Sequence, residues 1–127
     1  MTGREEIKLI TYYEDLVVWQ RAMDLVEETY RLVKLLPREE DYVLASQMRR
    51  AAVSIPSNIA EGQSRHTTKE FLNFLSIANG SKSELKTQLQ ICVRLGYVTA
   101  EQTEKATSLL EEISKMLYAL MIKLQRN

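Results

Sequence analysis

Residues 106–124, ATSLLEEISKMLYALMIKL, decide the fold class of this chain. Apolar side chains return there at alternating steps of three and four residues, which places them along one side of an α-helix. A sustained seven-residue repeat of this kind is typical of a helix that packs against other helices. The stripe consists of Ala106, Leu110, Ile113, Leu117, Leu120 and Leu124.

Three earlier segments have the same helical spacing, and short punctuated joints separate them. Pro37 closes the first segment, because the residue before a proline is pushed out of the α region. Gly62 and Gly96 are natural stops for the second and third segments. Thr67 with Glu70, and Thr99 with Gln102, have the spacing of a capping box at a helix start. We therefore predict helices over about 14–36, 39–62, 68–95 and 100–125.

The first of these helices has an apolar surface too wide for a two-stranded coiled coil, as a helix in a larger bundle requires. Two neighbouring stripes make up this surface. One contains Leu16, Trp19, Met23, Val26, Tyr30 and Val33, and the other contains Val18, Ala22, Leu25, Thr29 and Leu32.

Joints of only a few residues make consecutive helices antiparallel neighbours. The predicted fold class is therefore all-α: a single-domain, antiparallel up-down-up-down four-helix bundle over residues 14–126, preceded by an N-terminal tail over 1–13. Gly80, in the middle of the third helix, predicts a site where another helix approaches closely. Pro56, inside the second helix, frees a backbone carbonyl, which we expect Ser54, Ser57 or Asn58 to help satisfy.

The residue inventory argues against enzymatic and metal chemistry. Cys92 and His66 are the sole cysteine and histidine, too few for a structural zinc site or for the paired Glu-x-x-His motifs of a di-iron bundle. Cys92 falls on an apolar stripe and is expected in the core. We predict a non-enzymatic protein with no cofactor, no metal and no small-molecule substrate. A single cysteine also favours a reducing cytoplasm, and no segment is apolar enough for a membrane span.

Polar residues within the second and third helices form the first candidate site. Arginine has a planar fork that can pair with a carboxylate, so Arg49 and Arg50 could pair with Glu61 or Glu84 where two helices or two subunits meet. An ordinary solvated helix face is the alternative. The full candidate network or interface is Arg49, Arg50, Asn58, Glu61, Ser81 and Glu84.

Basic residues form the second candidate site. The formal net charge is zero, so nucleic-acid binding would depend on a local patch. Residues 41–98 hold seven basic and four acidic side chains, and an ordinary soluble surface is the alternative there too. The candidate nucleic-acid-binding residues, where exposed, are Arg49, Arg50, Arg65, Lys69, Lys82 and Lys86.

Several of these stretches resemble a known family, the four-helix-bundle proteins encoded in intervening sequences of bacterial 23S rRNA genes, which are described as ribosomal-protein-like. The central match is the block over residues 47–62, QMRRAAVSIPSNIAEG. Other matching stretches are EDLVVWQ over 14–20, Leu36-Pro37, Glu70-Phe71-Leu72, Ala78, Gly80-Ser81 and Glu84-Leu85.

The resemblance implies a homopentamer of four-helix bundles without enzymatic activity, linked to ribosomal RNA by gene location. The accessory variability proteins of diversity-generating retroelements are similar in fold and pentameric, and they bind nucleic acid and a reverse transcriptase through a basic surface. This chain departs from its relatives at Asn79 and Lys82, where they often carry a basic residue and a leucine. We therefore expect an oligomeric bundle associated with ribosomal RNA or another nucleic acid; the alternative is a protein–protein scaffold without a nucleic-acid ligand.

Overall fold

A computed structural model describes residues 12–126 of the chain. Four α-helices account for most of this range, and no strand occurs within it. Three short 3₁₀ helices lie at the joints. The elements are η1 (Tyr13–Asp15), α2 (Val17–Val33), η2 (Arg38–Glu40), α3 (Leu44–Gln63), α4 (Thr68–Arg94), η3 (Glu101–Thr103) and α5 (Glu104–Gln125).

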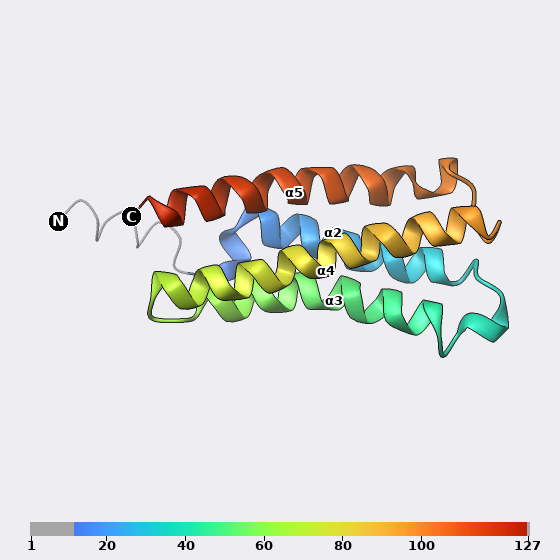
Figure 1. Cartoon of the computed structure of the whole chain (residues 1–127), viewed down its shortest axis with the longest axis horizontal. Helices are drawn as coiled ribbons and strands as arrows, with labels where there is room; N and C mark the ends of the chain where they lie inside the picture. The colour runs from blue at the N-terminus through green and yellow to red at the C-terminus, as the bar shows by residue number, and fades with distance from the viewer. Residues whose placement is uncertain (1–11, 127) are drawn as a thin grey trace.

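The four α-helices pack in a closed cycle. α3 packs against α2 and α4, while α5 packs against the same two helices. Consecutive helices run in opposite directions along the long axis, as the colours in Figure 1 show. The all-α four-helix bundle predicted from the sequence is confirmed. Because the cycle is closed, the α2–α3 side and the α4–α5 side are opposite sides of the molecule.

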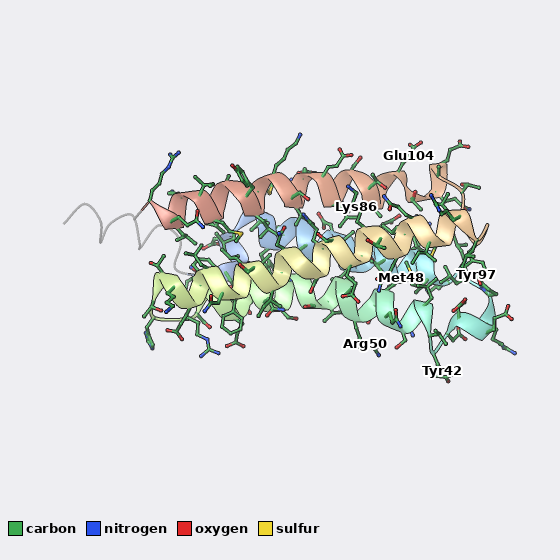
Figure 2. All side chains as sticks on the ribbon, in the orientation of Figure 1. Tyr42, Met48, Arg50, Lys86, Tyr97 and Glu104 are labelled. Carbon is green, nitrogen blue, oxygen red and sulfur yellow. The ribbon has the colours of Figure 1, made fainter. Side chains whose placement is uncertain are left out.

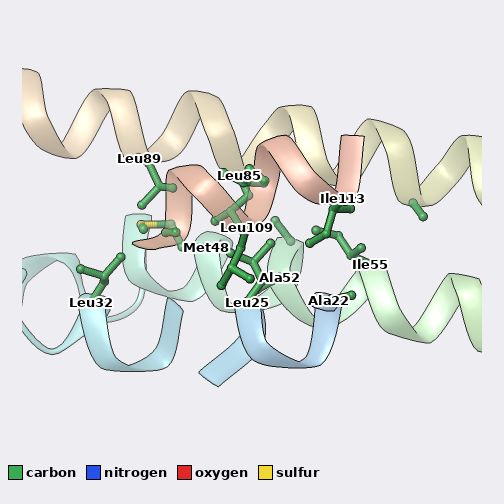
Figure 3. Packing of buried hydrophobic residues seen from close by; sticks show 14 of the residues in the cluster. Ala22, Leu25, Leu32, Met48, Ala52, Ile55, Leu85, Leu89, Leu109 and Ile113 are labelled. Carbon is green, nitrogen blue, oxygen red and sulfur yellow. The ribbon is translucent and has the colours of Figure 1, made fainter. Parts of the chain in front are cut away.

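Side chains from all four helices form one core. Figure 3 shows Leu25 of α2, Ala52 of α3, Leu85 of α4 and Leu109 of α5 meeting there. The stripe that decides the fold class is buried along most of α5, because its members face the axis of the bundle. Its buried members are Ala106, Leu110, Ile113 and Leu117; Leu120 and Leu124 are partly buried.

The two apolar stripes of α2 have different environments. The stripe from Val18 to Leu32 is buried against the other helices. The other stripe is buried only at its ends, at Leu16 and Val33. Between them, Met23 keeps 38% and Tyr30 keeps 43% of its surface open. Neighbouring residues point 100° apart around a helix, so only one of the two stripes can face the core directly.

The first helix begins later than predicted. Tyr13–Asp15 form η1, and the extended Leu16 (φ −76°, ψ 123°) separates it from α2, which starts at Val17 rather than at residue 14. The ring of Tyr13 packs edge-on against Trp19, with centroids 5.3 Å apart. This aromatic contact holds the chain across the start of α2. Residues 1–11 of the predicted tail lie outside the described residues.

The second helix starts at Leu44, not at residue 39. Val43 interrupts it with non-helical angles (φ −118°, ψ −95°), so the acidic residues before it lie in η2 and the following turn. Glu40 still acts on the helix start, because its carboxylate accepts a hydrogen bond from the Leu44 amide at 3.4 Å.

The fourth helix also starts later than predicted, at Glu104 rather than at residue 100, because η3 precedes it. The third helix ends at Arg94, one residue before the predicted end.

The capping box predicted for the third helix is confirmed. The Glu70 amide donates to Thr67 Oγ1 at 3.2 Å at the start of α4. Thr99 and Gln102 exchange the predicted reciprocal bonds, of 2.9 and 3.1 Å, but across the start of η3. The fourth helix itself begins after Thr103 and has no side-chain cap.

Two expectations about unusual residues were wrong. Gly80 has no atom within 4 Å of the place where a Cβ would stand, whereas a Cβ on Gly62 would lie 2.8 Å from Phe74 Cβ. The close approach therefore occurs at Gly62, near the joint where α3 and α4 converge, and α3 continues past this glycine to Gln63. Asn58 Nδ2 donates to the Ser54 carbonyl at 2.8 Å, but the carbonyl that Pro56 frees is that of Ala52, four residues earlier.

Candidate interaction surfaces

Part of the predicted polar network exists, at the contact between α3 and α4. Ser81 Oγ of α4 lies 2.8 Å from Ser54 Oγ of α3, and Asn58 Nδ2 donates to the same Ser54 Oγ at 2.9 Å. The structure thus joins Asn58 and Ser81 through Ser54, which the sequence analysis used only in connection with Pro56. These half-buried groups satisfy one another where two helices meet.

Within one chain, the arginines do not pair with Glu61 or Glu84; a pairing between subunits stays a prediction. Arg49 Nη2 donates to the carbonyl of Asp41 at 3.0 Å, and Arg50 Nη1 donates to Ser46 Oγ at 2.9 Å. Eleven or more residues separate these arginines from Glu61 on the same helix, a rise of about 16 Å or more, so their side chains meet nearer groups first. Figure 2 shows Arg50 on the outer edge of α3.

The two glutamates have partners on their own helices or close to them. Glu61 pairs with Arg65 one turn later, at 2.7 Å. Glu84 accepts a hydrogen bond of 3.3 Å from the amide of Gln88, which is almost fully buried. One-turn spacing brings such partners together on one helix face. Within one chain, the six network residues therefore belong to several local pairs rather than to one site.

A partly exposed apolar surface, which we call the α2–α3 face, is the other candidate. It consists of Trp19, Met23, Val26 and Tyr30 of α2; Val53 of the adjacent α3 is also exposed. Arg21 marks the α5 flank of α2, because it pairs with Glu112 of α5 at 3.0 Å. Trp19 points about 200° away from Arg21 around the helix, so its stripe lies on the α3 flank.

The predicted basic residues do not form a single patch. Arg65 pairs with Glu61 and lies over the ring of Phe74, 5.0 Å from its centroid. Lys69 is exposed at the start of α4, near Arg65. Lys82 and Lys86 lie farther along α4, and Lys86 faces α5 (Figure 2). Four helical positions separate the two lysines, which places them one turn apart.

Lys86 lines a groove between α4 and α5, which we call the α4–α5 groove. The groove has a volume of about 430 Å³. Burial and the neighbouring charge of Lys86 lower the pKa of Lys82, one turn away. Arg94, Thr103 and Thr107 were missed in the sequence, although Arg94 continues the four-residue spacing of Lys82 and Lys86. The lining residues are Lys86, Leu89, Gln90, Val93, Arg94, Thr103, Thr107 and Leu110.

The sequence and the fold both match known proteins. Residues 14–119 match the family described as 23S rRNA-intervening sequence protein. The chain belongs to this family. A solved structure of a family relative, a protein of unknown function from the S23 ribosomal protein family of Bacteroides thetaiotaomicron, has 28% sequence identity and a TM-score of 0.76. The alignment covers 82% of this chain and 97% of that one. No curated protein matches the chain.

In this 23S rRNA-intervening sequence protein, Cys92 is a core residue. Its thiol is fully buried and lies 3.6 Å from the sulfur of Met48, and burial raises the pKa of the thiol. A buried thiol with a raised pKa is a poor nucleophile.

Within residues 12–126, no three His, Cys, Asp or Glu side chains are grouped to hold a metal ion. No helix in that range is both long and apolar enough to cross a bilayer.

Proposed function

We propose that this protein is a non-enzymatic helical module that self-associates through the α2–α3 face. The half-exposed, uncharged stripe on α2 is the observation that carries this proposal: Trp19, Met23, Val26 and Tyr30 fill positions that usually hold charged residues on an outer helix face. Aromatic and methionine side chains are enriched in the cores of protein interfaces. A second copy of the chain would bury this stripe.

We infer that the assembly is the homopentamer that the family resemblance implies. In a cyclic pentamer each subunit contacts its two neighbours through two different, complementary surfaces. The α2–α3 face supplies one of these two surfaces on every subunit. We place the protein in the cytoplasm, where the single thiol of Cys92 would stay reduced.

Substitution of Tyr30 by glutamate tests the self-association. The native protein should have a mass about five times 14.7 kDa in light scattering, and Tyr30→Glu should reduce this mass to that of a smaller species. A desolvated, unpaired carboxylate at an interface is strongly unfavourable. Tyr118→Glu is the matched control, because Tyr118 is 70% exposed on α5. A native monomer, or equal mass loss in both variants, would refute the proposal. Circular dichroism verifies that each variant is folded.

Association with ribosomal RNA or another nucleic acid is a second candidate function. The family is described by its link to 23S rRNA genes, which supports this function. The adjacent positive charges of Lys82 and Lys86 also support it. Phosphate contacts release counterions, so binding should weaken steeply as salt rises. Binding that stays flat between low and moderate salt would contradict this function. Recovery of the native complex with a protein and no RNA would instead favour a scaffold without a nucleic-acid ligand.

A further inference from the structure

We propose that the α4–α5 groove holds the phosphate backbone of a single-stranded RNA. This inference rests on the second proposed function, nucleic-acid association, and adds the site. It does not depend on self-association. Three observations support it: the side chains that line the groove, the absence of ion pairs at its cations, and the spacing of these cations along α4.

The groove presents cations above an apolar floor. Lys86 and Arg94 of α4 are its charged residues, and Thr103 and Thr107 add hydroxyl groups from the opposite wall. All eight lining residues are neutral or basic. Leu89, Val93 and Leu110 make up the apolar part, which can contact the faces of sugars and bases. A positively charged groove that follows the backbone is the common element of single-strand binding sites.

The positive charges of the groove have no carboxylate partners. In residues 12–126, no ion pair joins Lys86 or Arg94, or Lys82 beside the groove, to an acidic side chain. Arg21 has two acidic partners, and Arg31 and Arg65 have one each. Like charges one turn apart on a helix repel each other. Partial burial adds to this cost at Lys82, whose pKa it lowers. A bound anion would offset both terms.

The spacing of the cations favours an extended anion over a compact one. Lys82, Lys86, Gln90 and Arg94 follow one another at intervals of four residues along α4. Each interval rises about 6 Å along the helix axis. Lys86 and Arg94, the two cations that line the groove, therefore lie about 12 Å apart along the helix axis, which suits a chain of phosphates better than a single phosphate group.

The groove is separate from the surface proposed for self-association. The α2–α3 face and the α4–α5 groove lie on opposite sides of the closed cycle of helices (Figure 1). The α2–α3 face of a subunit therefore does not include that subunit's own groove. In a ring whose second contact surface lies outside the groove, each subunit would contribute one pair of cations to the same RNA, which would strengthen binding through multivalency.

Fluorescence anisotropy with a labelled oligouridylate tests the site across a series of potassium chloride concentrations. The double variant Lys86→Gln/Arg94→Gln should bind more weakly than the native protein at low salt. Its plot of log affinity against log salt should be shallower by about 1.4, because each contact to a single strand contributes about 0.7 to the slope. The charge-matched control, Lys34→Gln/Arg38→Gln, removes one lysine and one arginine beyond α2 and should behave as the native protein does.

Three results would overturn the inference: no binding of the oligouridylate by the native protein at low salt, equal losses in the two double variants, or competition by inorganic phosphate well beyond that of chloride at the same ionic strength. The last result would indicate a site for one phosphate group. Light scattering on the same samples separates the two proposals. Weaker RNA binding by Lys86→Gln/Arg94→Gln at unchanged mass would support the groove as the RNA site. A reduced mass of Tyr30→Glu with retained RNA binding would support self-association as a separate property.

Discussion

Tyr97 links two joints of the chain that are far apart in sequence. Its hydroxyl donates to Glu40 Oε2 at 2.8 Å, so the turn after α4 is tied to η2. The same carboxylate accepts from the Leu44 amide and thereby caps α3. One glutamate outside any α-helix therefore holds the start of one helix and the end of another.

This contact predicts a dependence of stability on pH. The hydrogen bond and the charge of Glu40 raise the pKa of Tyr97 above its ordinary value of 10. The folded state thus holds this proton more tightly than the unfolded state, and the contribution is fully present below pH 10 and is lost as pH rises through the folded pKa. Native protein should lose more thermal stability between pH 8 and pH 11 than Tyr97→Phe does.

Thermal melts of both proteins across this range provide the measurement. Tyr97→Phe should also melt at a lower temperature than the native protein at pH 8, because it leaves Glu40 without this donor. Parallel melting curves that keep a constant offset at every pH would contradict the assigned role.

At the scale of elements, the packing of α3 on α4 depends on which glycine lies at the contact. A Cβ on Gly62 would stand 2.9 Å from Phe71 Cδ1 as well as 2.8 Å from Phe74 Cβ. These distances are too short for any real Cβ contact, so the helices would have to separate. Gly80, in the interior of α4, has open space around it.

Alanine substitutions at the two glycines should therefore have opposite effects. Gly62→Ala should destabilise the fold by about 1–3 kcal/mol through overpacking. Gly80→Ala should stabilise it by up to about 1 kcal/mol, because alanine is the better helix former. Urea denaturation gives both free energies of unfolding. Destabilisation by Gly80→Ala would show that a neighbouring subunit or ligand occupies the space beside it.

The helices themselves were largely predictable, and their ends less so. The α4 bounds were correct to within one residue because Thr67 and Glu70 form a local cap that the spacing reveals. The start of α3 was missed by five residues. Its N-terminus depends on Val43 and on the carboxylate of Glu40, which the Tyr97 hydroxyl also engages from a distant part of the chain.

At the scale of the whole molecule, the exposed stripe on α2 predicts a stability that depends on protein concentration. Association of folded subunits stabilises them by mass action, so the melting temperature of the native protein should rise as its concentration increases. Tyr30→Glu should remove most of this dependence, while Tyr118→Glu should retain it. Differential scanning calorimetry over a hundredfold concentration range is the measurement. A melting temperature that is independent of concentration in the native protein would count against assembly in this range.

The candidate sites were less predictable than the fold. Ser81 and Asn58 were correctly linked, but the serine that joins them was assigned no place in the network. Arg49 and Arg50 were expected to pair with Glu61 or Glu84 where helices or subunits meet. Within the chain they bond to the Asp41 carbonyl and the Ser46 hydroxyl. Long side chains bond to the nearest suitable acceptor, and the fold decides which acceptor lies nearest.

By itself, the sequence determined that this chain forms amphipathic helices, because the spacing of residues such as Leu110, Ile113 and Leu117 sets their directions around one helix axis. It also determined the cap of α4, which is local. Only the tertiary structure decided which α2 stripe is buried, that Gly62 rather than Gly80 lies at a close contact, and that Lys86 and Arg94 share a groove with α5. Each of these depends on the position of a neighbouring helix, which periodicity within one helix does not specify.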